Sequence, residues 1–351
     1  MKDRMMVDNF NSRENNFDLL RFIAATLVIL SHSYPLSLGS NSSEIFIRIT
    51  RGQETFGGLG VAIFFIISGF LITYSYERCS NLYQYFRNRI LRIFPALLFV
   101  LFISALIMGP LLTSLDLRSY FKNGNTLGYL ESFMLINMHY NLPGVFEHNP
   151  YPNAVNGSLW TLWYEFFFYI LVAVMGQLKL LKKPVLIVIF LVTLLLSFEV
   201  SQMYAGYQYI KLFTYFSAGM LFYVFRNEIR FKAIYLVLST LALLYLTVRG
   251  HYQIAFIFFG TYIIFHLGVG LKKYFKKFQE VGDFSYGMYI YAFPIQQIVS
   301  LVLSKHINPF NNFIFSFPLT FGVSVLSWFF IEKKCMNLKL KEKIMVEKKT
   351  S

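Results

Sequence analysis

Apolar residues dominate the chain in long runs, and shorter polar segments separate one run from the next. A membrane-spanning helix needs about 20 largely apolar residues, so we expect a spanning helix in each run of that order. The ten runs are 17–34, 57–76, 93–112, 158–176, 184–200, 209–225, 232–248, 252–271, 284–303 and 313–332. This pattern predicts an all-α polytopic membrane protein with about ten transmembrane helices.

The composition points the same way. Hydrophobic residues make up 56% of the 351 residues and charged residues only 14%, whereas a soluble domain carries roughly 25% charged residues. A globular core of ordinary size cannot hide so much apolar surface. Part of that surface must face lipid, which makes the bilayer an expected partner and excludes an ordinary soluble protein.

Positive charge is distributed unevenly among the segments that join the runs. The chain has 32 Lys and Arg against 18 Asp and Glu, a net charge of +14. With a cytoplasmic N-terminus, 24 basic residues fall in inside segments and seven outside, in line with the positive-inside rule. We therefore expect an even number of spans with the N and C termini cytoplasmic. Because no zinc-finger spacing or basic amphipathic helix accompanies the charge, nucleic acid is not an expected partner.

The runs cover nearly the whole chain. This predicts one integral-membrane domain at residues 1–340 and a basic cytoplasmic tail at 341–351. One long outside segment, 113–157, is rich in Asn, Gly and Pro. Its apolar piece, 127–138, is too short to span a membrane and favours a re-entrant or interfacial helix.

The first run contains ionisable residues, which cost about 3 kcal/mol each at the centre of a span. Arg21 and His32 are 11 residues apart, so they lie on one helix face, and Asp18 can pair with Arg21 at i,i+3. Two interpretations of His32 stay open here. It is a hydrogen-bonded histidine at the outer membrane rim, or an acid-base group of the kind used in acyl transfer.

The fourth run opens with a polar stripe. On a helix, Ser158, Thr161 and Glu165 share one face, with the carboxylate about 10 Å below the outer surface. A buried carboxylate needs a partner. His32, at a similar predicted depth, is the candidate.

Arginine is concentrated in the cytoplasmic segment before the third run, where Arg89 and Arg92 stand at i,i+3. They are either positive-inside anchors or guanidinium groups that bind a phosphorylated cytosolic ligand in bidentate geometry.

In the second run, Gly60, Ser68 and Gly69 allow another helix to approach closely. No histidine pair has zinc-site spacing, so we expect no metal.

Five motifs, in order along the chain, resemble those of the acyltransferase 3 family of integral-membrane acyltransferases, and the resemblance extends from about Asn16 to Lys341. The motifs are a basic residue, ten arbitrary residues and His at Arg21 and His32; Gly-Val-x-x-Phe-Phe-x-x-Ser-Gly-Phe-Leu at 60–71; Arg-x-x-Arg-Ile-x-Pro at 89–95; Ser-Leu-Trp-x-Leu-x-x-Glu at 158–165; and Gly-Asp-x-Ser-Tyr-Gly-x-Tyr at 282–289.

Two positions depart from the family pattern. Where many members read Trp-His-x-Pro, this chain has Tyr-Ala-Phe-Pro at 291–294, so no histidine there is assigned a role. Where Ile-Glu-Lys-Pro often ends the last span, it has Ile-Glu-Lys-Lys at 331–334. Neither departure affects the first-span histidine or the arginine motif.

The resemblance implies an O-acetyltransferase of the bacterial inner membrane. It would move an acyl group, most often acetyl, from cytosolic acyl-CoA to a hydroxyl of a cell-surface carbohydrate such as an exopolysaccharide, capsule or O-antigen unit. Acyl-CoA is then a donor substrate, and no bound cofactor is expected. His32 would act as the base toward the acceptor hydroxyl or as the acyl carrier. The residues implied are His32, Glu165 and Arg21 as catalytic groups, Arg89 and Arg92 for the CoA phosphates, and Asp18, Ser158, Trp160 and Ser68 as support.

The alternative is a non-catalytic polytopic transporter or flippase of a glycan or lipid. Such a protein would show paired internal repeats and broken helices near the midplane, and the sequence shows no repeat. Neither hypothesis assigns an oligomeric state.

Overall fold

A computed structural model describes residues 4–6, 10, 15–200, 204, 206–271 and 282–338. The fold is all-α, as predicted, apart from two short paired strands, β1 (Arg4–Met5) and β2 (Arg230–Phe231), which are antiparallel. The predicted basic tail at 341–351 lies outside the described residues.

A helix coincides with each of the ten predicted spans. These helices are α2 (Phe17–Leu38), α4 (Phe56–Arg78), α5 (Leu82–Ile103) with η1 (Ser104–Met108) and α6 (Gly109–Leu112), η3 (Gly157–Leu159) with α9 (Trp160–Gln177), α10 (Lys183–Glu199), α11 (Tyr207–Val224), α12 (Ala233–Val248), α13 (Tyr252–Ala255) with η4 (Phe256–Gly260), α14 (Thr261–Phe265) and η5 (His266–Gly270), α16 (Ser285–Leu303), and α17 (Pro309–Ser327) with η7 (Trp328–Glu332). Shorter helices are α3 (Ile45–Ile49), α7 (Leu117–Lys122), α8 (Gly124–Glu131), η2 (Ser132–Met134) and η6 (Ser304–His306).

Seven helical stretches of the described chain are long and apolar enough to cross a membrane. They are Phe17–Leu38, Phe56–Arg78, Leu82–Leu112, Gly157–Gln177, Tyr252–Gly270, Ser285–His306 and Pro309–Leu338. α12 is apolar but shorter. The chain is therefore a multi-pass membrane protein, while the count of ten spans stays a prediction.

The third spanning helix begins earlier than predicted. α5 starts at Leu82 because the side chain of Asn81 accepts a hydrogen bond from the backbone N–H of Gln84 at 2.8 Å, which caps the helix. Arg89 and Arg92 therefore lie on α5 itself. A search for apolar runs misses this first part because three arginines, a glutamine and an asparagine interrupt it.

The contacts divide the chain into two interleaved compact units. The first unit comprises Met1–Val28, Ser42–Cys79 and Tyr164–Asp283, and the second comprises Ile29–Asn41, Ser80–Trp163 and Phe284–Ser351. α2 and α9 each contribute residues to both units. The single domain at 1–340 stays a prediction.

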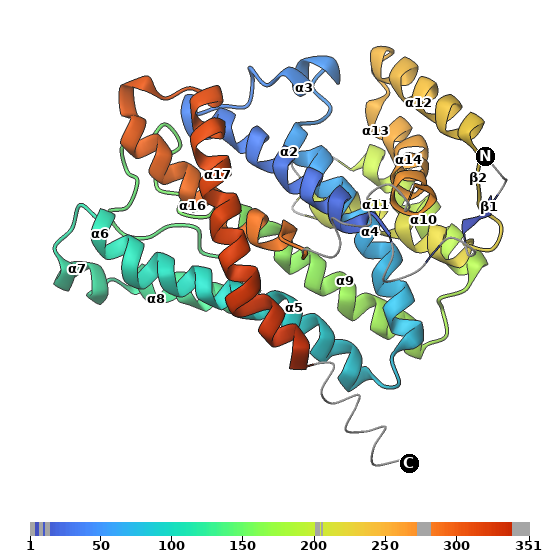
Figure 1. Cartoon of the computed structure of the whole chain (residues 1–351), viewed down its shortest axis with the longest axis horizontal. Coiled ribbons are helices and arrows are strands. Elements are labelled where there is room, and N and C mark those ends of the chain that lie inside the picture. The colour runs from blue at the N-terminus through green and yellow to red at the C-terminus, as the bar shows by residue number, and fades with distance from the viewer. Residues whose placement is uncertain are drawn as a thin grey trace. The chain divides into compact units, whose positions relative to one another are not determined.

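In the first unit, α4 packs closely against α11 (Figure 1). A Cβ added at Gly69 would collide with the backbone carbonyl of Phe216, and one added at Gly219 would collide with the carbonyl of Ile66. The expected role of Gly69 in close helix approach is thus confirmed, and Gly219 supplies the matching position on α11. Ser68, next to Gly69, is buried on α4.

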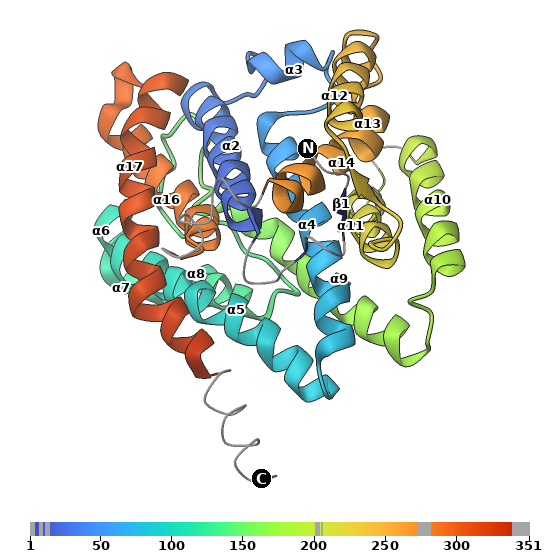
Figure 2. The same cartoon turned by 45° about the vertical axis from the view of Figure 1, so that its right-hand side comes forward.

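In the second unit, α16 and α17 lie side by side in both views (Figures 1 and 2). Side-chain hydrogen bonds fasten the long outside segment to α16. Asn149 donates to the side-chain oxygen of Gln297 at 2.7 Å, and Asn156 donates to the backbone carbonyl of Ile290 at 2.8 Å. The predicted short helix in that segment appears as α8 and η2, which pack against α5.

Candidate functional site

Arg21 lies on the first turns of α2, in the first unit, between two carboxylates. Its guanidinium is 3.9 Å from the Asp18 carboxylate and 3.5 Å from that of Asp283. The Asp18 pair is the predicted i,i+3 contact. Asp283 was not expected. It occupies the second position of the Gly-Asp motif, and that motif was the sequence signal that could have pointed to it.

The start of α2 is held against η5 in the same unit. The backbone N–H of Asn16 donates to the carbonyl of Gly268 at 2.7 Å, and its side-chain amide donates to the carbonyl of Leu267 at 2.9 Å. The side-chain oxygen of Asn15 accepts a hydrogen bond from the backbone N–H of Phe17, the first residue of α2, at 3.0 Å. These hydrogen bonds hold the first turn of α2, from which the side chain of Arg21 extends.

His32 lies two turns before the end of α2, in the second unit, and is half-buried. Its Nδ1 atom is buried and makes no hydrogen bond within the described structure. The imidazole meets the ring of Phe293 edge-on, with centroids 5.3 Å apart and planes at 75°. Phe293 is the third residue of the Tyr-Ala-Phe-Pro sequence that departs from the family pattern.

Phe293 also packs against the residue before Ser158. A Cβ at Gly157 would lie 2.7 Å from Cε2 of Phe293, so glycine is needed for this close approach. Ser158 is fully buried, and its hydroxyl makes no hydrogen bond within the described part of the chain. The next turn is fastened to α16 by the hydroxyls of Thr161 and Tyr289, 2.7 Å apart. Trp160, which lies between Ser158 and Thr161 in the sequence, is half-buried.

Glu165 lies on α9 and is half-buried. Its carboxylate accepts a hydrogen bond from the hydroxyl of Tyr169, one turn further along the helix. Glu165 belongs to the first unit and His32 to the second. The expected pairing of the two stays a prediction.

Arg92 on α5 contacts three groups of the second unit. The Glu332 carboxylate is 3.9 Å from its guanidinium, the Met336 sulfur is 3.7 Å away, and the guanidinium lies 5.8 Å from the ring centre of Tyr286. Glu332 is only 2% exposed, so Arg92 counters a buried negative charge. The sequence analysis identifies the Ile-Glu-Lys-Lys segment at 331–334, but it does not predict that Glu332 pairs with Arg92 of the arginine motif.

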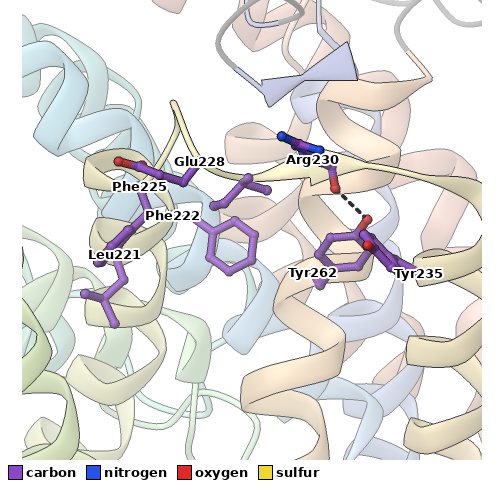
Figure 3. A pocket seen from close by; sticks show the side chains of 8 residues that line it. Leu221, Phe222, Phe225, Glu228, Arg230, Tyr235 and Tyr262 are labelled. Carbon is purple, nitrogen blue, oxygen red and sulfur yellow. Dashed lines mark hydrogen bonds between the residues drawn. The ribbon is translucent and has the colours of Figure 1, made fainter. Parts of the chain in front are cut away.

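One pocket of the first unit contains none of the residues predicted for acyl transfer (Figure 3). It measures about 430 Å³ and is lined by α11, β2, α12 and α14. Phe222, Tyr235 and Tyr262 form much of its wall, and the hydroxyl of Tyr262 donates to the carbonyl of Arg230 at 3.0 Å. Across the described residues, no group of three or more His, Cys, Asp and Glu is arranged to hold a metal ion.

Comparison with known proteins adds a family and two relatives. Residues 14–331 match the family described as an acyltransferase domain. The chain is 30% identical over 338 residues to an "O-acetyl transferase" of Shigella phage Sf6, covering 93% of this chain and 97% of that protein. It is 34% identical over 181 residues to "Nodulation protein 10" of Rhizobium leguminosarum bv. viciae, covering 46% of this chain and 44% of that protein. No solved structure matches.

Proposed function

Because the chain belongs to the acyltransferase family, matched over residues 14–331, we propose that it moves an acetyl group from cytosolic acyl-CoA to a cell-surface carbohydrate. The observation that carries the proposal is the 30% identity to a protein named O-acetyl transferase over 97% of that protein's length. The carbohydrate acceptor follows from the family resemblance.

His32 is the proposed catalytic group. As a base, it would take the proton of the acceptor hydroxyl while that oxygen attacks the thioester carbonyl of the donor. The C–S bond then breaks, and the CoA thiolate leaves and receives the proton. As an acyl carrier, the imidazole would attack the thioester first and pass the acetyl group to the hydroxyl in a second step. The imidazole packs against Phe293, and packing of this kind limits the ring's rotation.

Arg89 and Arg92 are the proposed donor-binding residues. Phosphate groups accept paired hydrogen bonds from guanidinium, and both arginines lie on α5. The Glu332 carboxylate lies 3.9 Å from the Arg92 guanidinium and restrains its position. We expect the CoA phosphates to accept hydrogen bonds from the same guanidinium.

The remaining predicted residues support this chemistry in the proposal. Arg21, held by Asp18 and Asp283, would line the cytoplasmic half of the route that the acyl group follows. Glu165 would stabilise the protonated form of His32, as a carboxylate does for other catalytic imidazoles. Ser158, Trp160 and Ser68 would shape the walls around the reacting groups.

We place the protein in the bacterial inner membrane with both termini in the cytoplasm. The uneven distribution of Lys and Arg supports this orientation. It puts the arginines of α5 on the side where acyl-CoA is available and His32 toward the outer face, where the carbohydrate acceptor would be reached.

The proposal is tested with purified protein in lipid vesicles, acetyl-CoA labelled in the acetyl group, and surface glycan from a strain that lacks the gene. We expect label to appear in the glycan as an ester. Mass spectrometry of the deletion strain's own glycan separates the alternatives. Polymer that is present without its acetyl group supports the enzyme, whereas loss of the polymer contradicts it and favours a transporter.

A further inference from the structure

The turn of α2 that carries His32 contains Pro35. Proline has no backbone N–H, so it cannot give the carbonyl of Ser31 its usual intrahelical hydrogen bond, and proline inside a helix tends to kink it. The helix is therefore one bond short on the turn that bears the proposed catalytic imidazole. Hydrogen bonds from a neighbouring helix add restraint to such a turn.

Two side chains of α16 bond to α2 on either side of His32. Gln296 donates from its amide to the backbone carbonyl of Ile29 at 2.8 Å. Ser300, one turn later on α16, donates from its hydroxyl to the carbonyl of Leu36 at 2.7 Å. The accepting residues bracket both His32 and Pro35.

Asn312 of α17 locks these two side chains to each other. Its Oδ1 accepts a hydrogen bond from the side-chain amide of Gln296 at 2.9 Å. Its Nδ2 donates to the Ser300 hydroxyl at 2.9 Å and to the backbone carbonyl of Gln296 at 3.1 Å. All three residues are at most 1% exposed. These hydrogen bonds are therefore shielded from water. Removing one partner of such a buried bond lowers stability by about 1–3 kcal/mol, because the other partner is left unsatisfied.

Hydrogen bonds between polar side chains also stabilise the packing of membrane helices in general. Here, however, both bonds to α2 end beside the turn that is weakened by Pro35. Phe293, one turn before Gln296 on the same helix, touches the imidazole itself. We propose that Gln296, Ser300 and Asn312 are positioning residues that hold His32 in its reactive place. This inference rests on the proposed function of His32.

The test compares two adjacent glutamines of α16. Gln297 is as fully buried as Gln296, but its amide donates to the carbonyls of Tyr151 and Ala154 in the outside segment, at 2.8 and 2.7 Å. Gln296→Leu and Gln297→Leu each remove a buried amide, and only the first loses the bond to α2. A small misplacement of a catalytic group costs up to about 100-fold in rate.

We expect Gln296→Leu to lower kcat roughly tenfold or more while KM for acetyl-CoA stays unchanged. Gln297→Leu should leave kcat within about twofold of the wild type. Rates are taken per folded protein, measured by gel filtration and thermal unfolding. Unchanged kcat in Gln296→Leu, or the same loss of kcat in both variants, overturns the positioning role.

A second pair of variants covers the case in which Gln296→Leu does not fold. Ser300→Ala removes the hydroxyl and should lower kcat, whereas Ser300→Thr keeps the hydroxyl and should restore it. Equal kcat in these two variants contradicts the proposal. His32→Ala tests the catalytic role of His32 separately. If that variant keeps the wild-type rate, the catalytic role of His32 fails and the positioning role with it; if it is inactive while Gln296→Leu is fully active, only the positioning role fails.

Discussion

Arg21 is a cation in the first spanning helix, and two carboxylates surround it. Asp283 approaches more closely than Asp18, at 3.5 Å against 3.9 Å, and its side chain is less exposed, at 10% against 21%. Charges interact more strongly where water is excluded. Asp283 should therefore contribute more than Asp18 to holding Arg21 in the protein.

Asparagine at each position gives a direct comparison. We expect Asp283→Asn to lower the free energy of unfolding in detergent by about 1–3 kcal/mol and Asp18→Asn by less. Thermal unfolding of the two variants beside the wild type measures the difference. Equal effects, or a larger effect of Asp18→Asn, would show that Asp283 is not the principal partner.

Arg89 and Arg92 on α5 are the proposed binding residues for the donor phosphates. If Arg89 and Arg92 bind the donor phosphates, alanine at both positions should raise KM for acetyl-CoA about tenfold or more, because each charge-assisted hydrogen bond contributes about 1.5–3 kcal/mol. Arg118→Ala is a suitable control, because this exposed arginine lies on α7 in the predicted outside segment. An unchanged KM in the double variant would leave the arginines as membrane anchors only.

The sequence predicts local pairs better than distant ones. The contact between Asp18 and Arg21 follows from helix geometry alone, since the two residues are three positions apart. The pairs of Arg21 with Asp283 and of Arg92 with Glu332 join motifs from opposite ends of the chain. No helical period relates those positions, so only the folded structure reveals them.

At the scale of helices, close packing depends on residues without side chains. Gly69 on α4 and Gly219 on α11 face backbone carbonyls of the opposite helix. Carbonyl groups of a helix cannot move aside as a flexible side chain can. The crossing of α4 and α11 is therefore fixed by two glycines.

Gly219→Ala should destabilise the protein by about 1–3 kcal/mol, because the methyl group forces the two helices apart. Gly322→Ala on α17 is the matched control, since an added Cβ there would meet no other described part of the protein within 4 Å beyond the backbone of its own helix, and it should change stability little. Melting temperatures in one detergent compare the variants. A Gly219→Ala protein as stable as Gly322→Ala would contradict the account of this crossing.

Helix positions were largely predictable, and their internal irregularities were not. Each predicted run of apolar residues coincides with a helix because hydrophobic length dominates in a membrane protein. The π-helical stretches η1, η4, η5 and η7 interrupt or extend α-helices, and no pattern of apolar residues in the sequence predicts them. The start of α5 was missed for a different reason, because charged and amide side chains interrupt the apolar run there.

For the whole molecule, the two units are interleaved along the chain, and α2 belongs to both. Arg21 lies in the first unit and His32 in the second. The apolar runs of the sequence predict where the helices lie. The division into two compact units depends on contacts between helices that are distant in the sequence, so the runs do not predict it. The orientation in the membrane, by contrast, is open to prediction from charge alone.

Single cysteines on either side of α17 test that orientation. Cys79 and Cys335 are first replaced by serine, and Lys305→Cys or Lys334→Cys is then introduced. A membrane-impermeant maleimide should label position 305 in intact cells and position 334 only after permeabilisation. Labelling of both positions from one side, or the reverse order, would contradict the predicted orientation.

A comparison of two histidine variants tests whether His32 carries out acyl transfer. Transfer of labelled acetyl from acetyl-CoA to glycan is measured for His32→Ala and for His306→Ala, an exposed histidine on η6. Loss of an acid-base group typically costs about 10²–10⁴-fold in rate. We predict a loss of that size in folded His32→Ala and wild-type activity in His306→Ala. A folded His32→Ala protein that transfers acetyl at close to the wild-type rate would show that His32 is not the catalytic group.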